Sequence, residues 1–183
     1  WSSDVCSSDL SIHHGVTTVV MGNCGVGFAP LIPGREQALI ELMEGVEDIP
    51  GVALAEGVRF NWQNFPQYMD ALDAMPHSLD FLVQVPHDPL RMAVMGERAQ
   101  AHEAATDDDI AAMRAQLRQG LLAGAAGFSS GRSDNHRTAR GQPTPASEAE
   151  LAITMIMNRM DLLLSDRWNE CPNPIASPDH APS

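Results

Sequence analysis

The chain is poor in positive charge and has no long hydrophobic run. Its 183 residues carry 24 acidic side chains against 11 basic ones, none of them a lysine, and the formal net charge is −13. Such a field repels phosphate backbones and argues against sequence-independent binding to nucleic acid. No apolar run approaches the roughly 18 residues of a membrane span, and no signal peptide is recognisable. We therefore expect a cytoplasmic protein with neither nucleic acid nor a membrane as partner.

Cysteine is also scarce, and this argues against a disulfide-stabilised fold. The three cysteines lie far apart in the chain, which is not the spacing of a disulfide framework. Hydrophobic residues make up 44% and charged residues 19%, a composition typical of globular proteins. We expect one domain with a core, in a reducing compartment.

The two ends differ in character from the rest of the chain. Residues 1–10, WSSDVCSSDL, have no helical or strand period and resemble a translated sequencing adapter, so we exclude them from functional interpretation. Residues 152–183 contain a helix-like segment and then a Pro-rich tail without a core pattern, and we treat them as uncertain. We expect the folded unit to be residues 11–151, an interior fragment of a larger domain.

Hydrophobic periodicity divides this unit into alternating strands and helices. In chain order we expect strand 15–21, helix 36–43, an irregular segment 44–60, helix 61–75, strand 79–85, a loop from His87, a helix capped by Thr106 and ending at Gly124, strand 126–129, a polar loop 131–146 and a helix from Glu148. The first two strands are continuous apolar runs, typical of strands buried on both faces.

This alternation predicts an α/β fold with a parallel sheet covered by helices. Right-handed crossovers place successive strands side by side with one polarity. A complete (β/α)₈ barrel needs about 250 residues, so three strands would form part of one. An open doubly wound sheet fits the pattern equally well.

Polar residues follow each of the three expected strands. Cys24 follows the first, His87 the second, and the segment Ser129–Arg132 the third. Because active sites of parallel α/β folds gather at the carboxyl ends of the strands, these residues should share one edge of the sheet. His136 lies further along the third of these loops.

Cys24 allows three interpretations on these grounds alone. It could be a small packed side chain, a nucleophile paired with His87, or a thiolate metal ligand. The glycines around it allow a sharp turn and a close ligand approach. His13 and His14 are adjacent, point in different directions and precede the first strand, so we expect a turn rather than a metal site.

Several motifs in order identify a resemblance. GVTTVVMGNCGVGFAP, LMEGVEDIPG, QVPHDPLRMAVMGER and GAAGFSSGR are similar to segments of the N-acyl-D-amino-acid deacylases, or D-aminoacylases, in the family-3 branch of the amidohydrolase superfamily. The similarity runs from about residue 11 to residue 151. It implies a partial TIM-type barrel with a zinc site of one or two ions at the carboxyl edge.

The resemblance also implies roles for particular residues. Cys24 stands where the family has a cysteine metal ligand, and His87 stands in a segment that lines the site. Arg132 and His136 match a region that approaches the substrate, and a basic residue there could hold a carboxylate. The family's His-x-His pair, its later histidine ligands and its catalytic aspartate have no counterpart within residues 11–151.

The implied chemistry is metal-assisted hydrolysis of the amide bond of an N-acyl-D-amino acid. Zinc activates water and polarises the acyl carbonyl, and an aspartate transfers the proton. Because one thiolate cannot complete a zinc site, we expect this chain alone to be inactive.

Two alternatives remain at this point. A cyclic amidase of the dihydroorotase or hydantoinase kind usually has a carboxylated lysine, which this lysine-free chain does not provide. A non-catalytic α/β binding module would need no ligand set.

Overall fold

The computed structural model describes residues 11–47 and 49–131. Its elements in chain order are β1 (Thr18–Met21), η1 (Asn23–Gly25), α2 (Glu36–Glu47), α3 (Gly51–Gly57), α4 (Phe65–Asp73), β2 (Asp80–Pro86), α5 (His87–Met95), α6 (Glu97–Gln100), α7 (Asp107–Leu122) and β3 (Gly127–Ser129). The expected mixture of strands and helices is confirmed.

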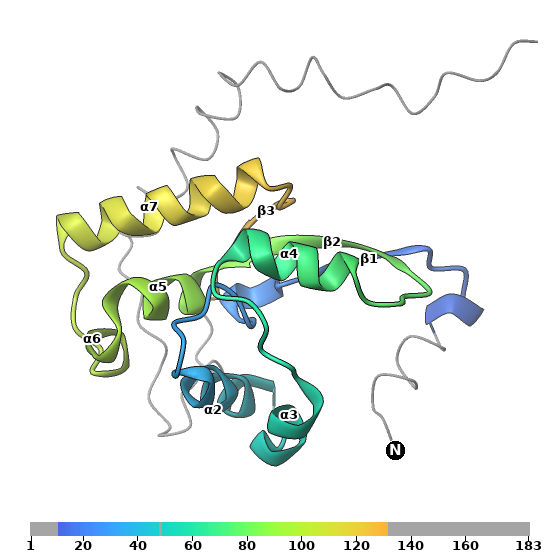
Figure 1. Ribbon diagram of the computed structural model, residues 1–183, viewed down its shortest axis with the longest axis horizontal. Helices are drawn as coiled ribbons and strands as arrows, with labels where there is room; N and C mark the ends of the chain where they lie inside the picture. Colours follow the sequence, from blue (N-terminus) through green and yellow to red (C-terminus); the bar gives the residue numbers. More distant parts are fainter. Residues whose placement is uncertain (1–10, 48, 132–183) are drawn as a thin grey trace, which may run out of the picture.

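The three strands form one parallel sheet in the order β1-β2-β3. Val20 of β1 pairs with Leu82 of β2, and Pro86 of β2 pairs with Ser129 of β3. Helices occupy both crossovers, and α4 and α7 lie side by side along β2 (Figure 1). Neighbouring strands are therefore consecutive in the chain, as the pattern predicts.

Two helices begin with complete capping boxes. The Asn64 and Thr106 side chains accept hydrogen bonds from the backbone N–H groups of Gln67 and Asp109, whose own side chains bond back to the cap residues. These reciprocal bonds satisfy donors that a helix start leaves without partners. The predicted start of α7 at Thr106 is confirmed, and α4 starts later than the apolar periodicity indicates.

The core lies between β2 and the helices α4, α5 and α7. Val85 and Leu90 are fully buried there, together with Met113 of α7. At Gly120 of α7, an added Cβ would lie 2.8 Å from Val85 Cγ2 and 3.2 Å from Phe65 Cδ1. The absence of a side chain at this glycine lets α7 pack directly on the strand and on α4.

At Val20 and Leu82 the other face of the sheet is open among the described residues, which differs from the expectation of strands buried on both faces. Val20 is 45% exposed and its register partner Leu82 is 50% exposed. Side chains alternate between the two faces of a strand, so Leu82 points away from the face that Val85 shares with α7. The described helices cover only the Val85 face at this position.

Two expected irregular segments are helical. Residues 44–60 contain the end of α2 and all of α3. α3 can form because Pro50 stands at its N-cap and Gly51 and Gly57 are its first and last residues, so none of the three interrupts the helix. The segment expected as a loop from His87 is α5, whose first turn accommodates Pro89 because a proline there sacrifices no intrahelical hydrogen bond. Of the expected loop 131–146 only Gly131 is described, and the expected helix from residue 148 lies outside the described residues.

Candidate functional site

The turn Gly22–Gly25, called the Cys24 turn below, lies where the three strands end. It follows β1 directly and contains η1. Because the strands are parallel and in consecutive order, the ends of β2 and β3 lie beside it. The shared edge predicted for Cys24 and the segment after β3 is therefore present.

The Cys24 turn requires glycine at two positions, because neighbouring backbone packs closely there and because both positions have a positive φ angle. Gly22 and Gly25 have φ angles of 76° and 80°, a region that favours glycine. A Cβ on Gly22 would lie 2.5 Å from the Gln84 carbonyl oxygen, and one on Gly25 would lie 2.7 Å from the Gly131 nitrogen. One glycine thus packs on β2 and the other on the segment after β3.

Hydrogen bonds from β2 and β3 hold the same turn. The Ser129 hydroxyl accepts from the Gly25 N–H at 3.1 Å and donates to the Gly22 carbonyl. On the other side, Gln84 Nε2 donates to Asn23 Oδ1 at 3.0 Å, while Asn23 Nδ2 donates to the Val20 carbonyl at 2.9 Å. The turn is thus held by side chains from β2 and β3 and by the backbone of β1.

Cys24 itself is exposed and its thiol forms no disulfide. Its φ of 57° and ψ of 15° place it in the left-handed region, which is uncommon for a residue other than glycine. Such conformations persist only where the surrounding structure enforces them, and they occur often at functional sites. The packing of the Cys24 turn supplies that enforcement.

His87 is the first residue of α5 and lies just past the end of β2, but its ring is buried. Its side chain is 1% exposed, and its Nδ1 lies 3.7 Å from Asp88 Oδ1. The ring packs edge-on against Phe128, with centroids 5.8 Å apart. The ring is thus enclosed at the edge where the sequence predicts that His87 lines the site, and that role stays a prediction.

The remaining predicted residues fall elsewhere. Arg132 and His136 lie outside the described residues. His13 and His14 are exposed and belong to a helical turn ahead of β1, closed by the bond from the His14 N–H to the Ser11 carbonyl. They lie before the amino end of β1, as the sequence predicts.

Within residues 11–47 and 49–131, no three His, Cys, Asp or Glu side chains come together as a group able to hold a metal ion. Cys24 fits one ligand position, because an exposed cysteine on a turn held by hydrogen bonds can offer zinc the sulfur donor that it prefers. The described part of the chain can therefore contribute one ligand to a zinc site.

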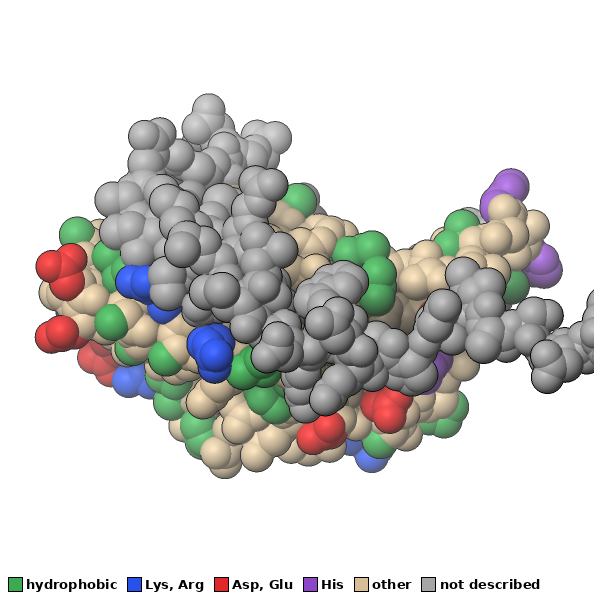
Figure 2. Space-filling view, turned by 90° about the horizontal axis from the view of Figure 1, so that it is seen from above, with side chains coloured by type: hydrophobic (Ala, Val, Ile, Leu, Met, Phe, Trp, Pro, Cys, Tyr) green, Lys and Arg blue, Asp and Glu red, His purple; other side chains and the backbone are tan. Residues whose placement is uncertain are grey.

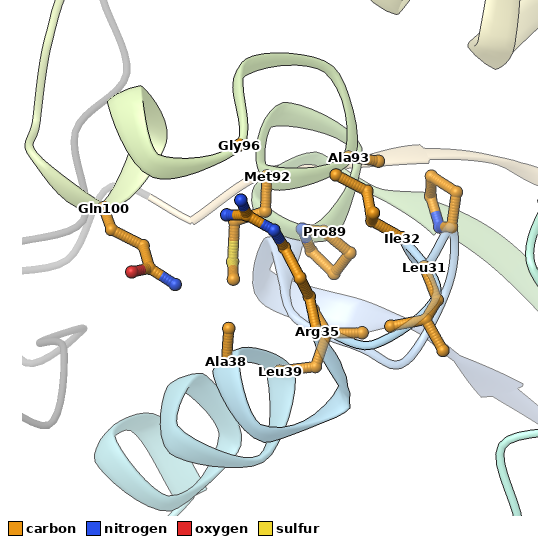
Figure 3. Close-up of a pocket in the computed structure, with 11 residues that line it drawn as sticks. Leu31, Ile32, Arg35, Ala38, Leu39, Pro89, Met92, Ala93, Gly96 and Gln100 are labelled. Carbon is orange, nitrogen blue, oxygen red and sulfur yellow. The ribbon is translucent and has the colours of Figure 1, made fainter.

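Two cavities lined by described residues lie away from this edge. A small one of about 10 Å³ lies between α2 and α5, with Arg35 and Met92 in its wall (Figure 3). A larger one of about 310 Å³ is lined by the loop at residues 30–33 and by α4, α5 and α7. No residue of the Cys24 turn lines either cavity.

Three described groups have clearly shifted pKa values, and none belongs to the Cys24 turn. Burial raises the pKa of Tyr68, which packs against Trp62 and Phe65. Hydrogen bonds from Thr106 lower the pKa of Asp109, and its partner Arg98 has a raised pKa. These three pKa shifts therefore concern the scaffold and not the candidate site.

On the face shown in Figure 2, acidic and basic side chains lie interspersed over the described surface.

The sequence pattern did not reveal the bonds of Ser129, Gln84 and Asn23. Ser129 could be placed at the edge, but its contact with the Cys24 turn spans 104 residues. Gln84 does leave a trace, since it is a polar residue in the otherwise apolar run FLVQV.

None of the helices in the described part of the chain has the length and apolar character of a membrane span.

Comparison with known proteins agrees with the motifs. No family model matches the chain. D-aminoacylase from Alcaligenes xylosoxydans xylosoxydans is 38% identical over 120 residues, which cover 66% of this chain and 22% of the relative. N-acyl-D-aspartate deacylase from the same organism is 36% identical over 120 residues, covering 66% and 21%. The chain spans about a fifth of the length of these curated relatives.

Solved structures give the same result. N-acyl-D-glutamate deacylase from Bordetella bronchiseptica, complexed with zinc and a phosphonate inhibitor, superposes with a TM-score of 0.57 at 32% identity, covering 82% of this chain and 28% of that one. D-aminoacylase, described as defining a novel subset of amidohydrolases, superposes with a TM-score of 0.53 at 33% identity, covering 79% and 26%. Sequence and backbone thus agree, and the chain is a relative of the D-aminoacylases among the amidohydrolases.

Proposed function

We propose that this chain is part of a zinc-dependent hydrolase that cleaves the amide bond of N-acyl-D-amino acids. The support is its relationship to D-aminoacylase and to the N-acyl-D-aspartate and N-acyl-D-glutamate deacylases. The fold that accompanies this function is a partial (β/α) barrel over residues 11–151, to which the parallel sheet contributes three strands. Residues 1–10 and 152–183 have no assigned part in it.

The observation that carries the proposal is the Cys24 turn. A thiol stands exposed in an enforced left-handed conformation at the carboxyl edge of a parallel sheet, where enzymes of this architecture place their chemistry. As a thiolate, Cys24 would be one ligand of a centre with one or two zinc ions. Bound zinc would supply an activated water and polarise the acyl carbonyl.

The other site residues keep the roles that the resemblance suggests. We assign Arg132 and His136 to the substrate side of the site, with a basic group to hold the carboxylate. His87 belongs to the same edge by position. Because its ring is buried, we place His87 in the wall of the site beneath a bound ligand and not in direct contact with that ligand. The burial also disfavours His87 as the base that would activate Cys24 as a nucleophile.

We also propose that the 183-residue chain alone does not turn over substrate. The described residues provide no three-ligand group, and a catalytic zinc normally takes three protein ligands and a water. The missing ligands and the general base would have to come from sequence that the longer relatives possess.

The test compares this chain with the longest polypeptide that its surrounding reading frame encodes. Both are assayed with N-acetyl-D- and N-acetyl-L-amino acids, with and without zinc, by release of the free amino acid. We expect D-selective, zinc-dependent release from the longer polypeptide, loss of it in Cys24→Ser, and none from the 183-residue chain. Zinc-independent release, or full activity in Cys24→Ser, would refute the proposed function.

A further inference from the structure

The conformation of the Cys24 turn depends on a side chain from β3, more than a hundred residues away. Ser129 is the last residue of that strand and is 9% exposed. Its hydroxyl accepts from the Gly25 N–H and donates to the Gly22 carbonyl, so one oxygen joins the two ends of the turn.

This pair of bonds closes the turn around Cys24. Gly22 and Gly25 are the residues on either side of Asn23 and Cys24. Because a buried polar group without a hydrogen-bond partner destabilises the folded state, the Ser129 hydroxyl favours this conformation over an open one.

A second bond fixes the opposite side. Gln84 of β2 donates to Asn23 Oδ1, and Asn23 in turn donates to the Val20 carbonyl of β1. Ser129 and Gln84 come from neighbouring strands and bond to different residues of the turn. Neither is adjacent to Cys24 in sequence, and Cys24 itself is exposed.

We propose that Ser129 is a positioning residue for the Cys24 thiol, with Gln84 holding the other side of the turn. Metal ligands need supporting groups that fix their orientation, and loss of such support typically lowers metal affinity 10- to 100-fold. The inference rests on the proposed function only in taking the thiol as a ligand. The hydrogen-bonded support of the turn can be tested without metal.

The first readout is amide hydrogen exchange at Gly25, measured by NMR on the full chain. Ser129→Ala should speed exchange at Gly25 by about fivefold or more, since one hydrogen bond is lost. Ser129→Thr keeps the hydroxyl and should restore slow exchange. Ser130→Ala removes the hydroxyl group of the next residue and is the matched control.

The second readout is protection of Cys24 from iodoacetamide by Zn²⁺, followed by mass spectrometry of the Cys24 peptide. It is made on the longer polypeptide of the activity test, because the described residues supply only one zinc ligand. The Zn²⁺ concentration for half-protection should rise severalfold in Ser129→Ala and stay near the unsubstituted value in Ser129→Thr. A urea titration of each variant separates this local effect from a general loss of stability. Should Ser129→Ala fail to fold, Gln84→Met removes the other bond and is expected to raise the half-protecting Zn²⁺ concentration in the same direction.

The outcomes separate the two proposals. An unchanged exchange rate at Gly25 in a folded Ser129→Ala variant overturns the positioning role. So does an equal half-protecting Zn²⁺ concentration in Ser129→Ala and in the unsubstituted polypeptide. Both results leave the proposed function standing. Faster exchange together with no Zn²⁺ protection of Cys24 in the unsubstituted longer polypeptide supports the Ser129 contact and counts against the proposed function.

Discussion

Two hydroxyl groups in this molecule each hold a backbone segment by hydrogen bonds, but their partners lie at very different separations along the sequence. Thr106 caps α7 by accepting from the Asp109 N–H, three residues ahead. Ser129 fixes the Cys24 turn by bonding to groups 104 and 107 residues away. The first stabilises a helix and the second shapes the candidate site. A local bond supports secondary structure wherever the helix happens to be, whereas a long-range bond can hold a reactive group at the place where strands converge.

The largest effect should come from Gly25→Ala in the Cys24 turn. The new Cβ would lie 2.7 Å from the Gly131 nitrogen, and overpacking of this kind costs about 1–3 kcal/mol in addition to the strain of a positive φ. Gly34→Ala is the matched control, because Gly34 has a φ of 82° but nothing within 4 Å of an added Cβ. It should cost only the strain, about 1–2 kcal/mol.

Urea unfolding of the two glycine variants measures the difference directly. If Gly25→Ala and Gly34→Ala lose equal stability, the close packing of the Cys24 turn against the segment after β3 is wrong.

A smaller effect is expected at the start of α7. Thr106→Ala removes the capping side chain and should lower the free energy of unfolding by about 1 kcal/mol. Thr106→Ser keeps the hydroxyl and should lose much less. The exchange rate at Gly25 should stay the same in both variants, since the cap does not contact the Cys24 turn. A faster Gly25 exchange in Thr106→Ala would remove the contrast between the two hydroxyls.

The smallest effect is a pH dependence confined to the same cap. Hydrogen bonds from the Thr106 N–H and hydroxyl, and then Arg98, hold the pKa of Asp109 below its usual value, against an opposing effect of burial. A carboxyl with a lowered folded pKa contributes stability above its unfolded pKa of about 3.9 and loses it as the pH falls through the folded pKa.

Asp109→Asn should therefore flatten the fall in stability between about pH 5 and pH 2, as measured by urea midpoints. Asp107→Asn, another acidic residue of the first turn, is the control. An unchanged acid slope in Asp109→Asn would show that the cap carries no charge-dependent stability.

The sequence predicted those parts of the fold that depend on local pattern. The capping residue Thr106 and the apolar spacing of Met113 and Leu117 suffice to place α7. The apolar runs located β1 and β2, and right-handed crossovers gave their order. α3 was missed because Pro50 and Gly51 look like helix breakers until it is known that they stand at a helix start.

The candidate site was predictable only in outline. Cys24 could be placed at the strand ends from the run of β-branched residues before it and the glycines around it. The burial of His87 depends on Phe128, which is 41 positions further along, and the bonds of Ser129 depend on the register of the sheet. Contacts of this kind arise from tertiary packing and leave little local trace.

The most direct test of the account is residue-by-residue alkylation of the cysteines with and without Zn²⁺, made on the longer polypeptide of the activity test because the described residues supply one zinc ligand. Iodoacetamide labelling is followed by mass spectrometry of each cysteine peptide, with Mg²⁺ as the control ion. We predict that Zn²⁺ slows the labelling of Cys24 selectively and that Mg²⁺ does not, because a thiolate binds zinc and not a hard cation. Equal labelling of Cys24 with and without Zn²⁺, or equal protection of every cysteine, would contradict the assignment of Cys24 as a metal ligand.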